Sequence, residues 1–382
     1  MLFRSLLTSP KSRPRVTGRL QVEALEDRAV PAAFTDPLGD FLPTYTGVPL
    51  PGMDVVAHEV VVLEEQGRVV FSGRMAGPIA PTQEIGALYL FGVDRGLGTP
   101  RFLDPPNSPP VIGPNVIWDL VVRINPNGTG QVNNIIAGRL VTPLSTADIS
   151  IVGNEFTASV PLSVLLPSAT RPPQEWTYNL WPRNGIGLNV QVSDLAPDDG
   201  NSPFQVVAPA RVASVAVNDG SAQRSMVNSL TVTFDGPVTL DPGAFELLRQ
   251  DGSPVELNVA PSELDGRTVA VLTFAGTDLV GGSLADGTYI LTIRGDRIHD
   301  RFGRELDGDG DGVAGGDWAD GLVRLFGDAD GDGDVDGQDR DRFRSAFGTS
   351  DAGYLWYFDF DGDGDVDGLD NGQFNRQFGH SQ

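Results

Sequence analysis

Between residues 34 and 300 the hydrophobic and polar positions follow the pattern of short β-strands separated by turns. Leu230, Val232 and Phe234 alternate with polar residues, which predicts a strand with one buried and one wet face. No stretch in this region keeps a 3.6-residue apolar period over three helical turns. The strand-like segments are 54–65, 68–77, 86–93, 117–124, 131–138, 148–162, 212–219, 229–238, 244–252, 267–276 and 286–296.

These segments form two series, which predict two successive β-sandwich domains. The first series covers residues 34–208 and includes a hairpin turn with Asn-Gly chemistry within 125–130. The second covers 209–324, and a proline-containing segment, 203–211, reads as the linker between them. The fold class expected is therefore mainly β, with two β-sandwiches followed by a small helical domain described next.

Residues 325–382 depart from this pattern, because one acidic loop of twelve residues is written twice. The copies are DADGDGDVDGQD at Asp328–Asp339 and DFDGDGDVDGLD at Asp359–Asp370. Each has Asp at positions 1, 3, 5, 9 and 12 and Gly at position 6, the ligand order of an EF-hand-type Ca²⁺ loop. Two carboxylates about 5 Å apart repel by roughly 3 kcal/mol at an effective dielectric near 20. Five in one short loop therefore favour a folded form that holds a divalent cation.

The repeat continues beyond the acids into two predicted helices of about ten residues each. Phe343 and Phe347 follow the first loop, and Phe374 and Phe378 follow the second with the same offset. Phe at i and i+4 lies on one helical face, so the two faces are expected to pack together. A glycine after each second Phe supplies the helix stop. A solvated acidic tail, the usual meaning of a charge run, would show neither the loop phase nor this repeat.

With Asp at position 12 and a tandem layout, residues 325–379 resemble a type I dockerin. The resemblance implies that position 7 offers a backbone oxygen, from Asp334 and Asp365, and that two Ca²⁺ ions are bound by the remaining carboxylates. The ligands implied for the first ion are Asp328, Asp330, Asp332, Asp336 and Asp339, and for the second Asp359, Asp361, Asp363, Asp367 and Asp370.

A dockerin resemblance also implies a protein partner, of which a cohesin-like domain is the candidate. Dockerins that bind cohesins often carry Ser-Thr at loop positions 10 and 11. This chain has Gly337-Gln338 and Gly368-Leu369 there. The resemblance therefore supports the calcium-binding fold more strongly than it supports cohesin as the partner.

A third acidic segment, LDGDGDGVAGGDW at 306–318, imitates only the first half of such a loop. Asp307, Asp309 and Asp311 repeat at a spacing of two, but the later ligand positions are Gly315 and Trp318. Asp317 is a substitute ligand if the loop closes differently. Both a third ion at Asp307–Asp311 and a solvated interdomain turn remain open.

Charge and composition narrow the function classes. The net charge is −24, and residues from Asp300 onward contribute −14 of it, so nucleic acid is not an expected partner. Cysteine is absent from the sequence, which leaves neither disulfides nor thiolate chemistry. Since no run approaches 18 apolar residues, no membrane span is predicted.

Residues 1–33 form a basic lead followed by LEDRAVPA, which resembles an export prefix of certain bacterial proteins. Loops that bind Ca²⁺ weakly work at extracellular calcium levels, which agrees with export. The expected location is secreted, extracellular or associated with the cell surface.

The two sandwiches leave further functions open. The second resembles bacterial Ig-like domains, which serve as spacers. The first resembles, more weakly, carbohydrate-binding and DOMON-type sandwiches, through DPLGD at 36–40 among others. Trp118, Trp176, Tyr178 and Trp181 then read either as a sugar-stacking platform or as core residues.

The sequence contains no recognised catalytic signature, such as HExxH, GxSxG or a phosphate-binding loop. Only three histidines are present, and they are scattered. The expectation is a non-catalytic, calcium-binding interaction protein. Polysaccharide binding, or polysaccharide hydrolysis by a distant carboxylate pair, stays as the alternative.

Overall fold

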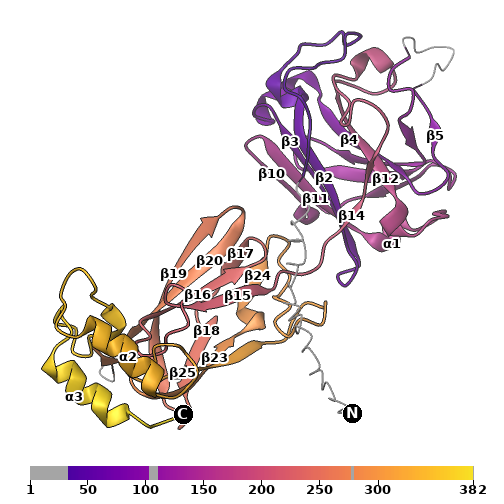
Figure 1. Ribbon diagram of the computed structural model, residues 1–382. Coiled ribbons are helices and arrows are strands. Elements are labelled where there is room, and N and C mark those ends of the chain that lie inside the picture. Colours follow the sequence, from indigo (N-terminus) through magenta and orange to yellow (C-terminus); the bar gives the residue numbers. More distant parts are fainter. Residues whose placement is uncertain (1–32, 103–110, 277–278, 382) are drawn as a thin grey trace, which may run out of the picture.

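The computed structural model describes residues 33–102, 111–276 and 279–381. The chain is mainly β, as predicted, with two sheet-rich units followed by a small helical unit. Figure 1 shows the three units in chain order, the first sandwich at the upper right and helices α2 and α3 at the lower left.

The first sandwich consists of two sheets packed face to face. One has the order β1-β2-β3-β11-β10, with β14 added parallel to β2, and the other β13-β12-β4-β7-β8-β9. The strands of the first sheet are β1 Phe34–Thr35, β2 Val55–Leu63, β3 Arg68–Met75, β10 Ile149–Val152, β11 Glu155–Pro161 and β14 Gln205–Val206. Those of the second are β4 Leu88–Asp94, β7 Leu120–Ile124, β8 Gly130–Asn134, β9 Leu140–Pro143, β12 Thr177–Arg183 and β13 Ser202–Pro203. A two-stranded ribbon, β5 Thr99–Pro100 with β6 Ile117–Trp118, and helix α1 Leu162–Leu165 complete it.

Alternation along the strands builds the core of this sandwich. In β3, Val69 and Phe71 are buried, and Phe91 of β4 and Phe156 of β11 meet them from both sheets. The Phe71 and Phe91 rings lie 5.1 Å apart, edge to face.

The second sandwich is one seven-stranded path that folds over itself, β15-β16-β20-β19-β18-β23-β25. The long strand β19 pairs with β20 over most of its length and with β18 at its start, so it joins the two layers. The strands are β15 Val212–Val217, β16 Ser229–Phe234, β18 Phe245–Arg249, β19 Pro254–Leu264, β20 Arg267–Ala275, β23 Gly287–Ile293 and β25 Trp318–Arg324. Two ribbons flank it, β17 Val238–Leu240 with β24 Ile298–Asp300, and β21 Leu279–Val280 with β22 Ser283–Leu284.

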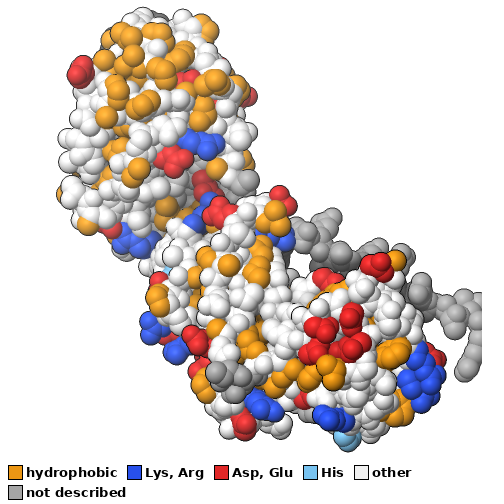
Figure 2. All heavy atoms as spheres, turned by 90° about the vertical axis from the view of Figure 1, so that its left-hand side faces the viewer, with side chains coloured by type: hydrophobic (Ala, Val, Ile, Leu, Met, Phe, Trp, Pro, Cys, Tyr) orange, Lys and Arg blue, Asp and Glu red, His pale blue; other side chains and the backbone are white. Residues whose placement is uncertain are grey.

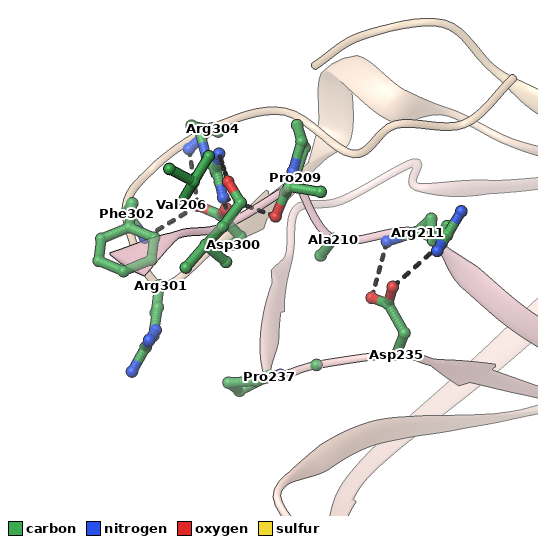
Figure 3. Close-up of a pocket in the computed structure, with 13 residues that line it drawn as sticks. Val206, Pro209, Ala210, Arg211, Asp235, Pro237, Asp300, Arg301, Phe302 and Arg304 are labelled. Carbon is green, nitrogen blue, oxygen red and sulfur yellow. Dashed lines mark hydrogen bonds and ion pairs between the residues drawn. The ribbon is translucent and has the colours of Figure 1, made fainter. Parts of the chain in front are cut away.

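Polar contacts tie the two sandwiches together at their joint. Arg304 donates to the carbonyl oxygens of Val207 and Ala208, at 2.8 and 2.9 Å. A surface cavity of ≈ 420 Å³ lies beside these contacts (Figure 3). Four of its charged groups pair with one another, Arg304 with Asp300 at 2.8 Å and Arg211 with Asp235 at 3.3 Å. Arg301, which also lines it, pairs with Glu59 of β2 at 2.8 Å. The cavity is therefore part of the joint between domains.

Helices α2 Gly337–Ala346 and α3 Gly368–Gln377 form the C-terminal unit, each ten residues long as the sequence predicted. Seven short 3₁₀ helices are spread along the described chain, at Pro51–Met53, Ala80–Ile85, Thr146–Asp148, Pro173–Glu175, Asn189–Gln191, Gly295–Arg297 and Trp356–Phe358.

The segments predicted from the sequence omit four strands of four or more residues, β9, β12, β19 and β25. They also omit the strands of two or three residues β1, β5, β13, β14, β21, β22 and β24. The predicted linker at 203–211 also begins with strand residues, because β14 returns to pair with β2.

Candidate metal centre

The two acidic loops, loop 1 (Asp328–Asp339) and loop 2 (Asp359–Asp370), fold alike, and each leads into a helix. The Asp at position 9 is the N-cap of the helix in both loops. Its Oδ1 accepts a hydrogen bond from the backbone amide two residues later, at 2.6 Å for Asp336 and 2.7 Å for Asp367. The position-12 carboxylate returns to the amide of the N-cap residue at 2.7 Å in both loops. This reciprocal capping sets where each helix begins.

The first Asp of each loop lies at its centre. Asp328 is fully buried and Asp359 nearly so. Each carboxylate accepts bonds from the amides at positions 4 and 6, at 2.6 and 3.1 Å in loop 1 and 2.7 and 2.9 Å in loop 2. Gly333 and Gly364, at position 6, have φ of +89° and +96°, a conformation that strains residues with a side chain. That requirement explains why glycine occupies position 6.

Carboxylates from positions 1, 3 and 12 converge in both loops. The oxygens of Asp328, Asp330 and Asp339 lie within 4.8 Å of one another, as do those of Asp359, Asp361 and Asp370. Asp330 Oδ1 is buried and has no hydrogen-bond partner. Both groups could hold a metal ion.

The predicted ligands at positions 5 and 7 differ in their contacts. At position 5, Asp332 and Asp363 accept bonds from the position-7 amides at 3.1 and 3.3 Å. At position 7, Asp334 Oδ1 and Asp365 Oδ1 are buried without a partner, although the sequence assigned this position only a backbone oxygen. In loop 1 the Asp334 carboxylate groups with those of positions 9 and 12. Position 7 thus brings a carboxylate as well as its carbonyl.

Each loop pairs with the segment that follows the helix of the other loop, in a pseudo-twofold arrangement. Val335 exchanges backbone hydrogen bonds with the residues that follow α3, and Val366 does so with those that follow α2, at 2.7–3.0 Å. Between the helices the rings of Phe343 and Phe374 stack with centroids 4.5 Å apart. Both rings are buried, which agrees with the prediction that the helices pack through phenylalanine.

The second phenylalanine of each pair does not join this core. Phe347 and Phe378 are 49% and 39% exposed. Each is the C-cap of its helix and has left the helical conformation, because the helix ends one residue earlier. The i and i+4 spacing therefore predicted correctly that Phe343 and Phe374 are buried between the helices. It predicted wrongly that Phe347 and Phe378 join them.

Burial, and to a smaller extent the crowding of like charges, raises the pKa of several of these carboxylates. Burial is the main cause that raises the pKa of Asp328 to about 6, although two backbone amides oppose it. Burial also raises the pKa of the carboxyl groups at position 3 (Asp330 and Asp361) and position 7 (Asp334 and Asp365), with neighbouring Asp charges adding to it.

Loop 2 has a side-chain contact that loop 1 lacks and that the sequence analysis did not predict. Burial disfavours the ionised form of Asp359, but the Tyr354 hydroxyl, at 2.7 Å from Oδ2, and backbone amides together hold its pKa below the ordinary value. Val323 occupies the corresponding position before loop 1. The first carboxylate of loop 2 is therefore kept ionised more firmly than that of loop 1.

The C-terminal unit is anchored to the second sandwich. Arg224 donates its amide to the carbonyl oxygen of Asp328 at 2.8 Å, and Ser225 Oγ donates to that of Tyr357 at 2.6 Å. Asp286 of the sandwich accepts from Gln377 of α3 at 2.8 Å and pairs with the buried Arg324. Loop 1 and the segment before loop 2 are thus held directly against the second sandwich. Figure 2, which faces this unit, shows acidic side chains gathered on its surface.

The third acidic segment also brings carboxylates together. Oxygens of Asp307, Asp309 and Asp311 lie within 4.8 Å of one another, and Asp307 Oδ1 is buried without a partner. Asp317, the suggested substitute ligand, instead accepts the Gly295 amide at 2.9 Å. This group is a further place that could hold a metal ion.

The aromatic residues considered for a sugar platform lie in the interior. Trp176, Tyr178 and Trp181 are at most 1% exposed, and Trp118 is 7% exposed. Trp176 and Tyr178 belong to the main core, while the other two pack beside Phe102. The core interpretation of these residues is confirmed.

The predicted export prefix, residues 1–33, lies outside the described residues except for its last one. Among the described residues no helix has the length and hydropathy needed to span a bilayer. No family model matches this chain, and no curated protein shows detectable similarity to it.

Proposed function

We propose that the chain is a secreted, non-catalytic Ca²⁺-binding protein whose C-terminal unit serves protein interaction or surface attachment. The observation that carries the proposal is the recurrence, in both loops, of one hydrogen-bonded aspartate arrangement with converging carboxylates. A repeated arrangement of buried carboxylates is costly unless a cation neutralises it.

Calcium fits this donor set better than other common metals. The groups are all oxygens, which excludes the soft metals that prefer thiolate or imidazole. Ca²⁺ accepts about six to eight oxygen ligands in irregular geometry, whereas Mg²⁺ demands a near-ideal octahedron. Loop 1 would supply Asp328, Asp330 and Asp339 together with the position-7 carbonyl, and loop 2 its equivalents. A third ion at Asp307–Asp311 follows from the same reasoning.

The exposed rings favour a protein partner for this unit. Phe347 and Phe378 occupy equivalent positions at the ends of α2 and α3, and Leu369 is 67% exposed on the first turn of α3. The Arg340 guanidinium lies 4.9 Å from the Phe378 ring centre, so a positive charge borders the apolar surface formed by Phe347, Phe378 and Leu369. Apolar rings rimmed by charge are typical of interaction surfaces. A cohesin-like domain is the first partner to test, as the dockerin resemblance implies.

Calcium titration calorimetry on the chelator-stripped full chain tests the metal half of this proposal. The expected result is saturable uptake at up to ~millimolar Ca²⁺, with reduced amide hydrogen exchange in both loops. La³⁺ displacement and a Mg²⁺ titration serve as controls for oxygen sites and for selectivity. No heat beyond that of the buffer blank, together with exchange rates in the loops that calcium does not change, would rule out the loops as ion sites.

The interaction half needs a separate measurement. The calcium-loaded chain is immobilised and cohesin-type domains are passed over it, with Phe347→Ser/Phe378→Ser as the surface variant. Binding that depends on calcium and is lost in the variant supports the proposed role. Equal binding by the variant would place the partner surface elsewhere.

A further inference from the structure

A further acidic cluster lies in the first sandwich, far in sequence from the acidic loops and from the segment at 306–318. Oxygens of Asp36, Asp40 and Asp194 lie within 4.8 Å of one another. Asp36 and Asp40 flank the turn after β1, whereas Asp194 follows the 3₁₀ helix at 189–191. The fold brings these residues together across more than 150 positions of sequence.

Asp54, just before β2, adds an independent observation. Its side chain is 2% exposed, and its Oδ2 accepts the Gly39 amide, within the Asp36–Asp40 turn, at 2.9 Å. Its Oδ1 is buried and has no hydrogen-bond partner. A buried, unpartnered carboxylate oxygen is expensive, so its retention beside three more carboxylates points to a cationic ligand.

Several carboxylate oxygens of this cluster accept no hydrogen bond. Asp36 Oδ2 and both oxygens of Asp40 are buried without partners, as is Asp54 Oδ1. Asp194 is fully buried, and its two oxygens each accept one amide, from Val55 and Leu195, both at 2.8 Å. Those amides fix the carboxylate in place and leave lone pairs for another ligand.

Two things can satisfy such a cluster, protons or a cation. Burial, together with the neighbouring Asp charges, raises the pKa of Asp36 to about 8 and that of Asp194 to about 7. Shared protons are therefore the rival explanation, and they would leave the cluster indifferent to metal ions.

We propose that Asp36, Asp40, Asp54 and Asp194 form a Ca²⁺ site in the first sandwich, separate from the C-terminal loops. Four carboxylates and no nitrogen or sulfur donor form a set of ligands for a hard cation. The ion would join the segment that enters β2 to the loop that follows β12. It would thereby fasten the N-terminal strand of the sandwich to both sheets.

Asp40→Asn separates the two explanations, because neither oxygen of Asp40 accepts a hydrogen bond. The substitution removes one negative charge and breaks no bond. In chelator it relieves repulsion, so the thermal midpoint of the first sandwich is expected to rise. In calcium it removes a ligand, so the midpoint is expected to fall below that of the unchanged chain. Glu84→Gln, an exposed carboxylate of the same sandwich, is the matched control.

The experiment uses the full chain, with Asp339→Asn/Asp370→Asn in the background so that the C-terminal loops do not dominate. Three quantities are measured at pH 7.5 in chelator and in calcium. They are the thermal midpoint, the hydrogen exchange of peptides covering 33–56 and 189–200, and the Ca²⁺ stoichiometry. The proposal predicts slower exchange in both peptides with calcium, and a loss of about one ion per chain in Asp40→Asn. A midpoint that rises equally in chelator and in calcium, with exchange unaffected by calcium, would overturn it in favour of shared protons. Neither outcome bears on the C-terminal proposal, because the background substitutions remove ligands from both loops and calcium binding by the loops is measured in a separate experiment.

Discussion

The hydrogen bond from Tyr354 to Asp359 gives the two similarly folded loops different responses to acid. Tyr354→Phe removes the hydroxyl that lies 2.7 Å from Asp359 Oδ2 and changes little else. Hydrogen bonds to charged groups contribute about 1.5–3 kcal/mol, and partial exposure of Tyr354 places this one near 1.5 kcal/mol. The substitution is expected to destabilise the ion-free C-terminal unit at pH 7 by about that amount.

The sign of the pH effect follows from the lowered pKa of Asp359. A lowered pKa stabilises the folded unit above the ordinary value of 3.8, and this contribution is lost as the pH falls through the folded-state pKa. Without the hydroxyl the pKa of Asp359 rises, so loop 2 is expected to lose calcium at a higher pH than before. Calcium titrations between pH 7 and 4, with hydrogen exchange of 354–370, follow this directly. Tyr357→Phe, in the same segment, is the control. Acid release of calcium that is identical in the two variants would refute the role given to Tyr354.

Three further predictions concern the same unit. Asp339→Ala and Asp370→Ala are each expected to remove about one bound ion and to weaken a helix cap by ~1 kcal/mol, and unchanged calorimetric stoichiometry would contradict the ligand assignment. Phe343→Ala is expected to destabilise the unit by about 3–5 kcal/mol in denaturant unfolding, whereas Phe347→Ala, at an exposed ring, should change it by less than ~0.5 kcal/mol. Equal losses would disprove the stacked core. The pKa of Asp328 is raised from 3.8 to about 6, so the ion-free unit should lose up to about 3 kcal/mol as the pH rises across that interval, and calcium should abolish the loss. Stability that increases over the same interval in chelator would reverse this sign.

Local patterns in the sequence predicted much of the fold. Alternation at Leu230, Val232 and Phe234 matches β16, in which these three side chains are buried and the intervening ones are not. The Asn-Gly turn within 125–130 joins β7 to β8 as expected. Such features depend on neighbouring residues, which is why sequence alone reveals them.

The missed strands lack that signal. β12 is buried on both faces, so Trp181 and its neighbours do not alternate and were considered for a surface platform. β19 is largely exposed and contains Pro254 and Pro261, which argue against a central strand. Its place is set by pairing with β20, a tertiary effect.

The candidate metal groups divide in the same way. Loops 1 and 2 are contiguous, so the spacing of their aspartates is enough to indicate the grouping. The group around Asp194 joins residues from the two ends of the first sandwich, and no local motif links them. Tyr354 was also missed, because its partner Asp359 is identified only by the fold of loop 2.

A crystal structure of the full chain grown in calcium, with anomalous diffraction data, tests the central claim most directly. The account predicts one anomalous peak inside each of loops 1 and 2, with carboxylate and position-7 carbonyl oxygens at about 2.3–2.6 Å. Both loops in this same conformation at millimolar calcium, with no anomalous peak in either, would contradict it.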